Sequence, residues 1–156
     1  MGQRLIKGRK GTSTVEFAIV LPLLLVILFG IIEFSLVMYD KAMITNASRE
    51  GARAGIVFRS DANTGLYSPM AQGEISQVVN DYLGTPPNSR LITSTNAPAI
   101  TTVVPTQCPD VTAAPPRQIT VTVTYPYTFW ILPNLVSTLV GFNPLSLTAV
   151  TTMRCE

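Results

Sequence analysis

The longest run of hydrophobic positions lies near the N-terminus, from Phe17 to Ile32, and is bounded by Glu16 and Glu33. Apolar residues continue beyond Glu33 as far as Tyr39, and Val15 precedes the run. Because an α-helix rises about 1.5 Å per residue, this stretch would extend roughly 35 Å, which is enough to cross a bilayer with some tilt. The pattern therefore predicts a single membrane-spanning helix.

A proline lies inside this run, and carboxylates lie at both of its margins. Pro22 would leave the carbonyl of Ala18 without its helical partner, which predicts a kinked or locally loosened helix. A carboxylate at an apolar margin is costly unless it is paired or reaches the headgroups. The spacing leaves Glu16 as either a marker of the membrane edge or a functional carboxylate, and it favours an edge position for Glu33.

Polar residues become frequent after Tyr39, but the helical pattern continues to residue 58. Small residues recur every four positions, at Ala47, Gly51 and Gly55, and would form a smooth stripe on one helical face. Glycine costs up to about 1 kcal/mol in a helix, so close packing against this stripe is expected. Its partner is either the helix of another subunit or the protein's own sheet, and the sheet is the favoured alternative.

The C-terminal part of the chain changes to turn-rich and β-type patterns. Ser60–Ser68 has the composition of a polar linker, Ser68-Pro69 predicts a helix start, and Gly84 predicts the end of that helix. The strands predicted from Thr and Val positions are Leu91–Thr95, Ile100–Val104, Gln118–Tyr125 and Ser146–Met153. We expect an α+β fold in which a long, partly transmembrane helix packs on a small antiparallel sheet.

A second hydrophobic segment runs from Thr128 to Phe142. It is too short, and too interrupted by Pro133, to span a membrane. The favoured interpretation is that it covers the sheet. The alternative is an exposed patch around Phe129 and Trp130 that meets a membrane surface or another subunit.

Charge is sparse and concentrated at one end. Charged residues make up 13% of the chain, yet Arg4, Lys7, Arg9 and Lys10 all fall within the first ten residues. The remainder holds seven basic residues (11 − 4) against nine acidic ones, which argues against nucleic-acid binding. The positive-inside rule places this basic end in the cytoplasm. A removable secretory signal is disfavoured because the apolar stretch is long and no A-x-A-like site follows it.

The residue types needed for catalysis or metal binding are scarce. Histidine is absent, and Cys108 and Cys155 are better explained by one disulfide in an oxidising compartment than by a redox or metal site. We expect no metal or cofactor site and no enzymatic activity, because the carboxylates in the C-terminal part share no catalytic motif. Those carboxylates are Asp61, Glu74, Asp81 and Asp110.

The start of the helix has a further pattern: a basic leader, Gly11, and then Glu16 as the fifth residue after it. This arrangement resembles the type IV prepilin signal. The resemblance implies that a prepilin peptidase cuts after Gly11 and makes Thr12 the new N-terminus. It also implies that Glu16, next to Phe17, pairs with the new ammonium group of a neighbouring subunit, which would offset the cost of a carboxylate in an apolar bundle.

The longer stretch GTSTVEFAIVLPLLLVILFGIIEF, with REGAR at Arg49 to Arg53, is similar to the TadE-like family of tight-adherence (Flp-type) pilus systems. The similarity implies a pilin-like pseudopilin or minor pilin that works with other pilin-like subunits and the inner-membrane assembly machinery. The expected parts are a leader (1–11), a transmembrane helix (12–39), a helix extension (40–58) and an extracytoplasmic α+β head (59–156). The alternative is an uncleaved, signal-anchored scaffold protein of the bacterial envelope.

Overall fold

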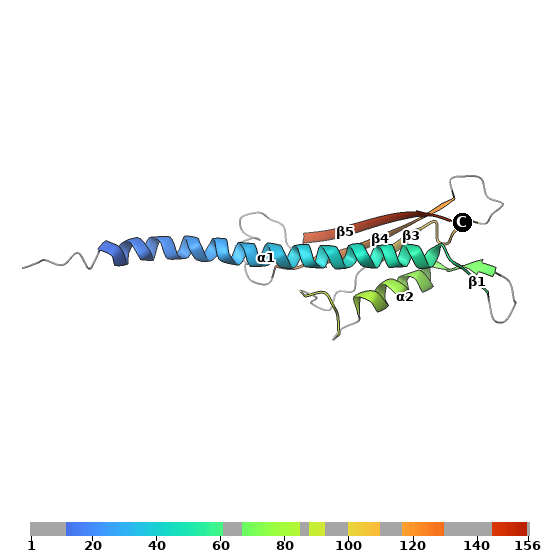
Figure 1. Cartoon of the computed structure of the whole chain (residues 1–156), viewed down its shortest axis with the longest axis horizontal. Helices are drawn as coiled ribbons and strands as arrows, with labels where there is room; N and C mark the ends of the chain where they lie inside the picture. Colours follow the sequence, from blue (N-terminus) through green and yellow to red (C-terminus); the bar gives the residue numbers. More distant parts are fainter. Residues whose placement is uncertain are drawn as a thin grey trace, which may run out of the picture.

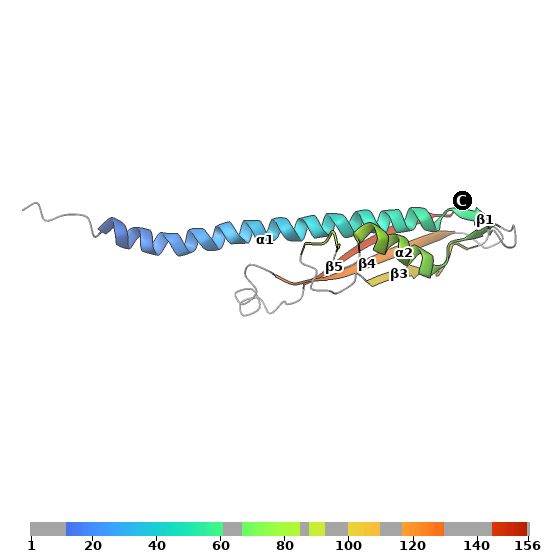
Figure 2. The same cartoon turned by 90° about the horizontal axis from the view of Figure 1, so that it is seen from below.

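A computed structural model of the chain describes residues 12–60, 67–84, 88–92, 100–109, 117–129 and 145–155. Its main feature is one long helix, α1 (Thr12–Gly55), whose C-terminal half packs against a small head (Figures 1 and 2). The N-terminal half projects away from the head in both views. The α+β class predicted from the sequence is confirmed: the helix carries an antiparallel sheet.

Helix α1 continues without a break through Pro22 and ends at Gly55. The predicted extension to residue 58 is too long, because Phe58 already belongs to strand β1 (Phe58–Ser60). This strand pairs antiparallel with β2 (Tyr67–Pro69), so the region predicted to be a polar linker contains a pair of short strands. The linker composition concealed them because both strands are short and mostly exposed.

The second helix, α2 (Gln72–Leu83), begins later than predicted. Pro69 lies in β2, and the helix start is set further on, where the Glu74 carboxylate accepts the Ala71 N–H at 3.0 Å. This contact satisfies one of the donors that a helix start leaves without a partner. The predicted end is confirmed at Gly84, whose φ of 75° and close approach to the Asn88 carbonyl suit only glycine.

The main sheet has the order β3-β4-β5 and is antiparallel throughout. Its strands are β3 (Ile100–Val104), β4 (Gln118–Tyr127) and β5 (Leu145–Arg154). The predicted strand at Leu91–Thr95 is not found in its described part. The Leu91 N–H is donated to the Ser89 hydroxyl and the Ile92 N–H to Asp40, so side chains replace a neighbouring strand as partners. Residues 93–95 lie outside the described part of the chain.

The hydrophobic core lies between the inner face of this sheet and the two helices. In β4 every second residue from Ile119 to Tyr127 is buried, which confirms the alternation in the sequence. Helix α1 crosses β4 and β5, while α2 lies beside α1 and reaches β3 (Figure 2). In the hydrophobic segment after β4, Thr128 and Phe129 are half-buried. The Phe129 ring packs edge-on against the Tyr127 ring, with the ring centroids 5.6 Å apart. Its remaining residues, 130–142, lie outside the described part.

Candidate assembly interface

The predicted assembly residues lie at the free end of α1. Thr12 is the first residue of the helix, whereas Gly11 precedes the described part of the chain. Glu16 and Phe17 are exposed, the latter by 62%. Within the described residues, no hydrogen bond or ion pair joins the Glu16 carboxylate to another group. This carboxylate therefore lies on a bare apolar surface, where a cationic partner would be strongly favoured.

The surface around Glu16 extends for several turns. An 18-residue window of α1 has a mean hydropathy of 2.9, and none of it is buried within the protein. Side chains such as Ile19, Leu23 and Ile31 are more than half exposed. A helix of this length and composition could span a membrane. Pro22 is also exposed, and the kink expected there remains a prediction.

The burial pattern changes abruptly at Glu33, which the sequence interpretation placed at a membrane edge. Its side chain is only 4% exposed, and its carboxylate accepts a 2.7 Å hydrogen bond from the hydroxyl of Tyr127 at the end of β4. Seven residues later Asp40 is completely buried and accepts the Ile92 N–H at 3.0 Å. Two carboxylates, two helical turns apart, therefore bind the end of the head that lies nearest the exposed half of α1.

Two further polar contacts continue this attachment toward the far end of the head. Lys41 donates from its ammonium group to the backbone carbonyl of Thr148 in β5. The buried Ser48 hydroxyl lies 2.7 Å from the hydroxyl of Thr151 in the same strand. Sequence reasoning missed all four attachments. The one available signal was the spacing of Glu33 and Asp40, which places both on the helical face that also bears the small residues.

The small residues occupy the apolar part of the same face. Ala47 is fully buried, and Gly51 and Gly55 are buried as well. A methyl group added at Gly51 would lie 2.6 Å from Val79 in α2, and one added at Gly55 would lie 2.9 Å from Ile75. The stripe thus packs within the protein, but the sheet that the sequence favoured is only part of its partner. Its nearest neighbours are Ile75 and Val79 in α2, and β4 contributes Ile119 and Val121.

The two cysteines form a disulfide, with Cα atoms 5.9 Å apart. The bond joins Cys108, which follows β3, to Cys155, which follows β5. It fixes the end of the chain to the loop that precedes β4, as the sequence suggested.

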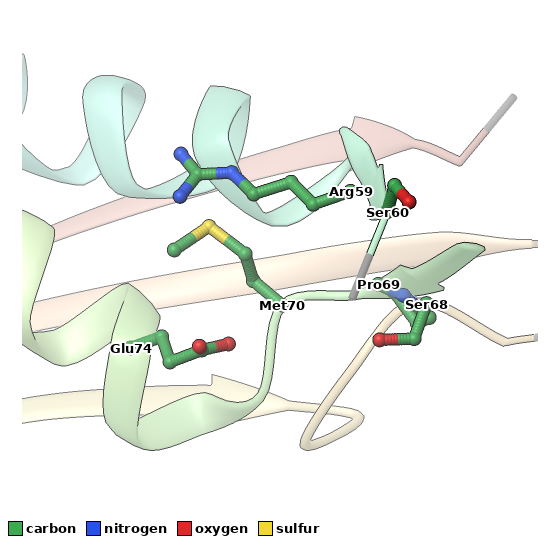
Figure 3. Close-up of a pocket in the computed structure, with 6 residues that line it drawn as sticks. All are labelled: Arg59, Ser60, Ser68, Pro69, Met70 and Glu74. Carbon is green, nitrogen blue, oxygen red and sulfur yellow. The ribbon is translucent and has the colours of Figure 1, made fainter. Parts of the chain in front are cut away.

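The other carboxylates considered from the sequence do not form a common site among the described residues. Glu74 caps α2, Asp81 is exposed on the same helix, and Asp61 and Asp110 lie outside the described part. A hollow of about 350 Å³ lies near β1, β2 and the start of α2 (Figure 3). Its lining includes Arg59 and Glu74, both of them exposed at the surface of the head.

Comparison with known protein families gives a match that covers most of helix α1. A family model described as TadE-like protein matches residues 11–53, from Gly11 to the last turn of α1. This segment is TadE-like. The TadE-like match covers 43 of the 156 residues and implies involvement in a tight-adherence pilus system. No curated protein and no solved structure matches the chain.

Proposed function

We propose that this protein is a pilin-like, non-enzymatic subunit of a tight-adherence pilus system, acting as a minor pilin or pseudopilin. The observation that carries the proposal is the position of the TadE-like match. It begins at Gly11, next to the first residue of α1, and includes an exposed Glu16 with no described partner. A peptidase that cuts after Gly11 would create an ammonium group at the start of the helix and would remove the basic leader.

The new ammonium group would supply the cation that Glu16 lacks. In an assembled bundle of helices the carboxylate is surrounded by apolar side chains, where an unpaired charge is strongly disfavoured. Pairing with the Thr12 ammonium of a neighbouring subunit would therefore fix the axial position of one subunit relative to the next. In this proposal the protein sits in the inner membrane with its leader in the cytoplasm and its head outside, and its partners are prepilin peptidase and other pilin-like subunits.

The first test is the mass of the full chain, expressed with and without an active prepilin peptidase. The expected product begins at Thr12 only when the peptidase is active. Gly11→Leu should block cleavage, whereas the matched change at the other leader glycine near the site, Gly8→Leu, should not. A product that begins at Met1 under every condition would rule out the processed-pilin mechanism.

The second test separates cleavage from assembly. Glu16→Gln should be cleaved normally but should be lost from isolated pili or from pilus assembly complexes. Glu50→Gln changes a carboxylate on the exposed, polar part of the same helix and serves as the matched control. Normal assembly by the Glu16 variant would contradict the pairing mechanism while leaving the cleavage result intact.

A further inference from the structure

The exposed apolar surface of α1 ends at different positions along the helix axis on two of its sides. The head covers one side, the head face, starting at Glu33 and continuing through Asp40 and Ile44. A second side, the free face, remains bare and apolar beyond that point: Phe34 is 65% exposed and Met38 is 52% exposed. Polar residues occupy the free face only beyond Met38, first at Lys41 and Thr45 and then at Arg49.

This offset is a property of the helix in three dimensions. At about 100° per residue, Glu33, Asp40 and Ile44 lie within roughly 40° of one another around the axis. Phe34 and Met38 lie about 100° and 140° away from Glu33. An upright helix would expose Phe34 and Met38 to water, or else it would push the near end of the head into lipid.

We propose that α1 crosses the bilayer with a tilt of about 25–35°, with the free face turned down toward the outer leaflet so that Phe34 and Met38 contact lipid. The inference rests on the membrane anchoring in the proposed function, but it does not depend on cleavage or on a pilus. Its partner is the lipid at the outer interface of the membrane. The head is held on the upper side of the tilted helix, clear of the hydrocarbon.

Two geometric quantities support this tilt. The exposed apolar surface ends at Glu33 on the head face and five residues later, at Met38, on the free face. This is an axial offset of about 7.5 Å across a helix about 11 Å wide, which corresponds to a tilt of about 35°. The free face runs from Glu16 to Met38, or about 33 Å, against a hydrocarbon thickness of about 30 Å, which requires about 25°. Both values fall inside the 0–40° range of membrane helices.

The position of Glu16 provides a further, independent argument. Glu16 precedes Phe34 by 18 residues, about five helical turns, so both lie on the same side of α1. In a tilted helix, the side that faces the membrane at the outer end faces the cytoplasm at the inner end. The tilt that keeps Phe34 in lipid therefore brings the Glu16 carboxylate toward the cytoplasmic headgroups, where an anion is tolerated.

The test uses single cysteines in the full chain, reconstituted into vesicles of phosphatidylcholine and phosphatidylglycerol. The native cysteines are joined in a disulfide, so a nitroxide label attaches only to the added thiol, and non-reducing mass spectrometry verifies this. The rate at which the label collides with oxygen, which concentrates in lipid, is compared with the rate at which it collides with a water-soluble nickel complex. The probes are Phe34→Cys and Met38→Cys, with Leu24→Cys as the mid-membrane reference and Arg49→Cys as the water reference.

The expected result is that Phe34→Cys and Met38→Cys favour oxygen, as Leu24→Cys does, whereas Arg49→Cys favours the nickel complex. If both probes resemble Arg49→Cys, the helix is upright and the proposal is wrong. If both collision rates are low and the spectra broaden with protein density, a second copy covers the free face, which also overturns it. A Leu24→Cys probe that is open to water would overturn the membrane anchoring itself, whereas failure of leader cleavage would leave the tilt unaffected. Polarised infrared spectroscopy of the unmodified chain in oriented bilayers measures the angle independently, and a value below about 15° would contradict the proposal.

Discussion

Among the glycines of α1, Gly51 is the one where an added methyl group would come nearest to the head, and replacing it with alanine tests this packing directly. The added methyl group would lie 2.6 Å from Cγ2 of Val79 and 3.5 Å from side-chain atoms of Ile75 and Val121. Val79 is completely buried in α2, and its β-branched side chain has one strongly preferred rotamer in a helix. The clash is therefore relieved by moving α2 away from α1 and not by a rotation of Val79.

Two opposing terms determine how much Gly51→Ala changes the free energy of unfolding. Overpacking a well-filled core costs about 1–3 kcal/mol, while replacing glycine in a helix interior stabilises it by up to about 1 kcal/mol. Since the approach is far inside an ordinary contact distance, we expect Gly51→Ala to lower the free energy of unfolding by about 1–2 kcal/mol. Gly55→Ala should have a smaller effect, because its nearest neighbour is the flexible end of Ile75.

The assay is urea unfolding of the full chain in detergent micelles, followed by far-ultraviolet circular dichroism. Gly73→Ala in α2 is the matched control, because an added methyl group there meets nothing within 4 Å. A double-mutant cycle with Val79→Ala should give a favourable coupling of about 1 kcal/mol, since that change removes the clashing methyl group. A Gly51→Ala protein as stable as the Gly73→Ala protein, or a coupling near zero, would refute the packing argument.

Two further predictions concern the ends of the head. Tyr127→Phe removes the hydroxyl that donates to the buried Glu33, so the free energy of unfolding in the same urea assay should fall by about 1–3 kcal/mol. Tyr67→Phe, at a 75% exposed position, is the control and should change it by less than about 0.5 kcal/mol. Equal effects of the two changes would contradict a stabilising hydrogen bond between Tyr127 and Glu33. Replacing Cys108 and Cys155 together with serine should lower the free energy of unfolding by about 4 kcal/mol, because the disulfide closes a loop with a sequence separation of 47. An unchanged urea midpoint for this double variant would show that the cross-link does not stabilise the head.

The parts of the fold that the sequence predicted are those governed by local periodicity. The apolar run defines α1, and the Thr-Val alternation defines β4, because helices and strands have different repeats of buried positions. Gly84 ends α2 because few other residues adopt its backbone angles without strain. Each of these signals lies within a few residues of the feature that it predicts.

Most of the errors and omissions depend on contacts that are distant in sequence. Glu33 resembles a membrane-edge residue because its partner, Tyr127, is 94 positions away. Ile92 has strand-like neighbours, but its N–H is bound by Asp40, 52 positions away. The start of α2 is an exception, because the Glu74 carboxylate and the Ala71 N–H are close in sequence; there, the proline at a plausible first position was the misleading signal. Apart from the seven-residue spacing of Glu33 and Asp40, these polar contacts leave no periodic pattern, so their partners are revealed only by the folded chain.

The TadE-like segment contains both halves of α1, and these halves have different physical requirements. Before Glu33 the helix is bare and apolar, which suits lipid or the helices of other subunits. From Glu33 to Gly51 it carries buried carboxylates and a glycine that fit the head, although the head lies outside the matched residues. A head of a different sequence on such a helix would have to supply a donor for the first carboxylate and a flat apolar surface at the glycine. We therefore expect the attachment geometry to restrict the head more strongly than the composition of its strands does, and Tyr127 and Val79 are the positions where this restriction acts in this chain.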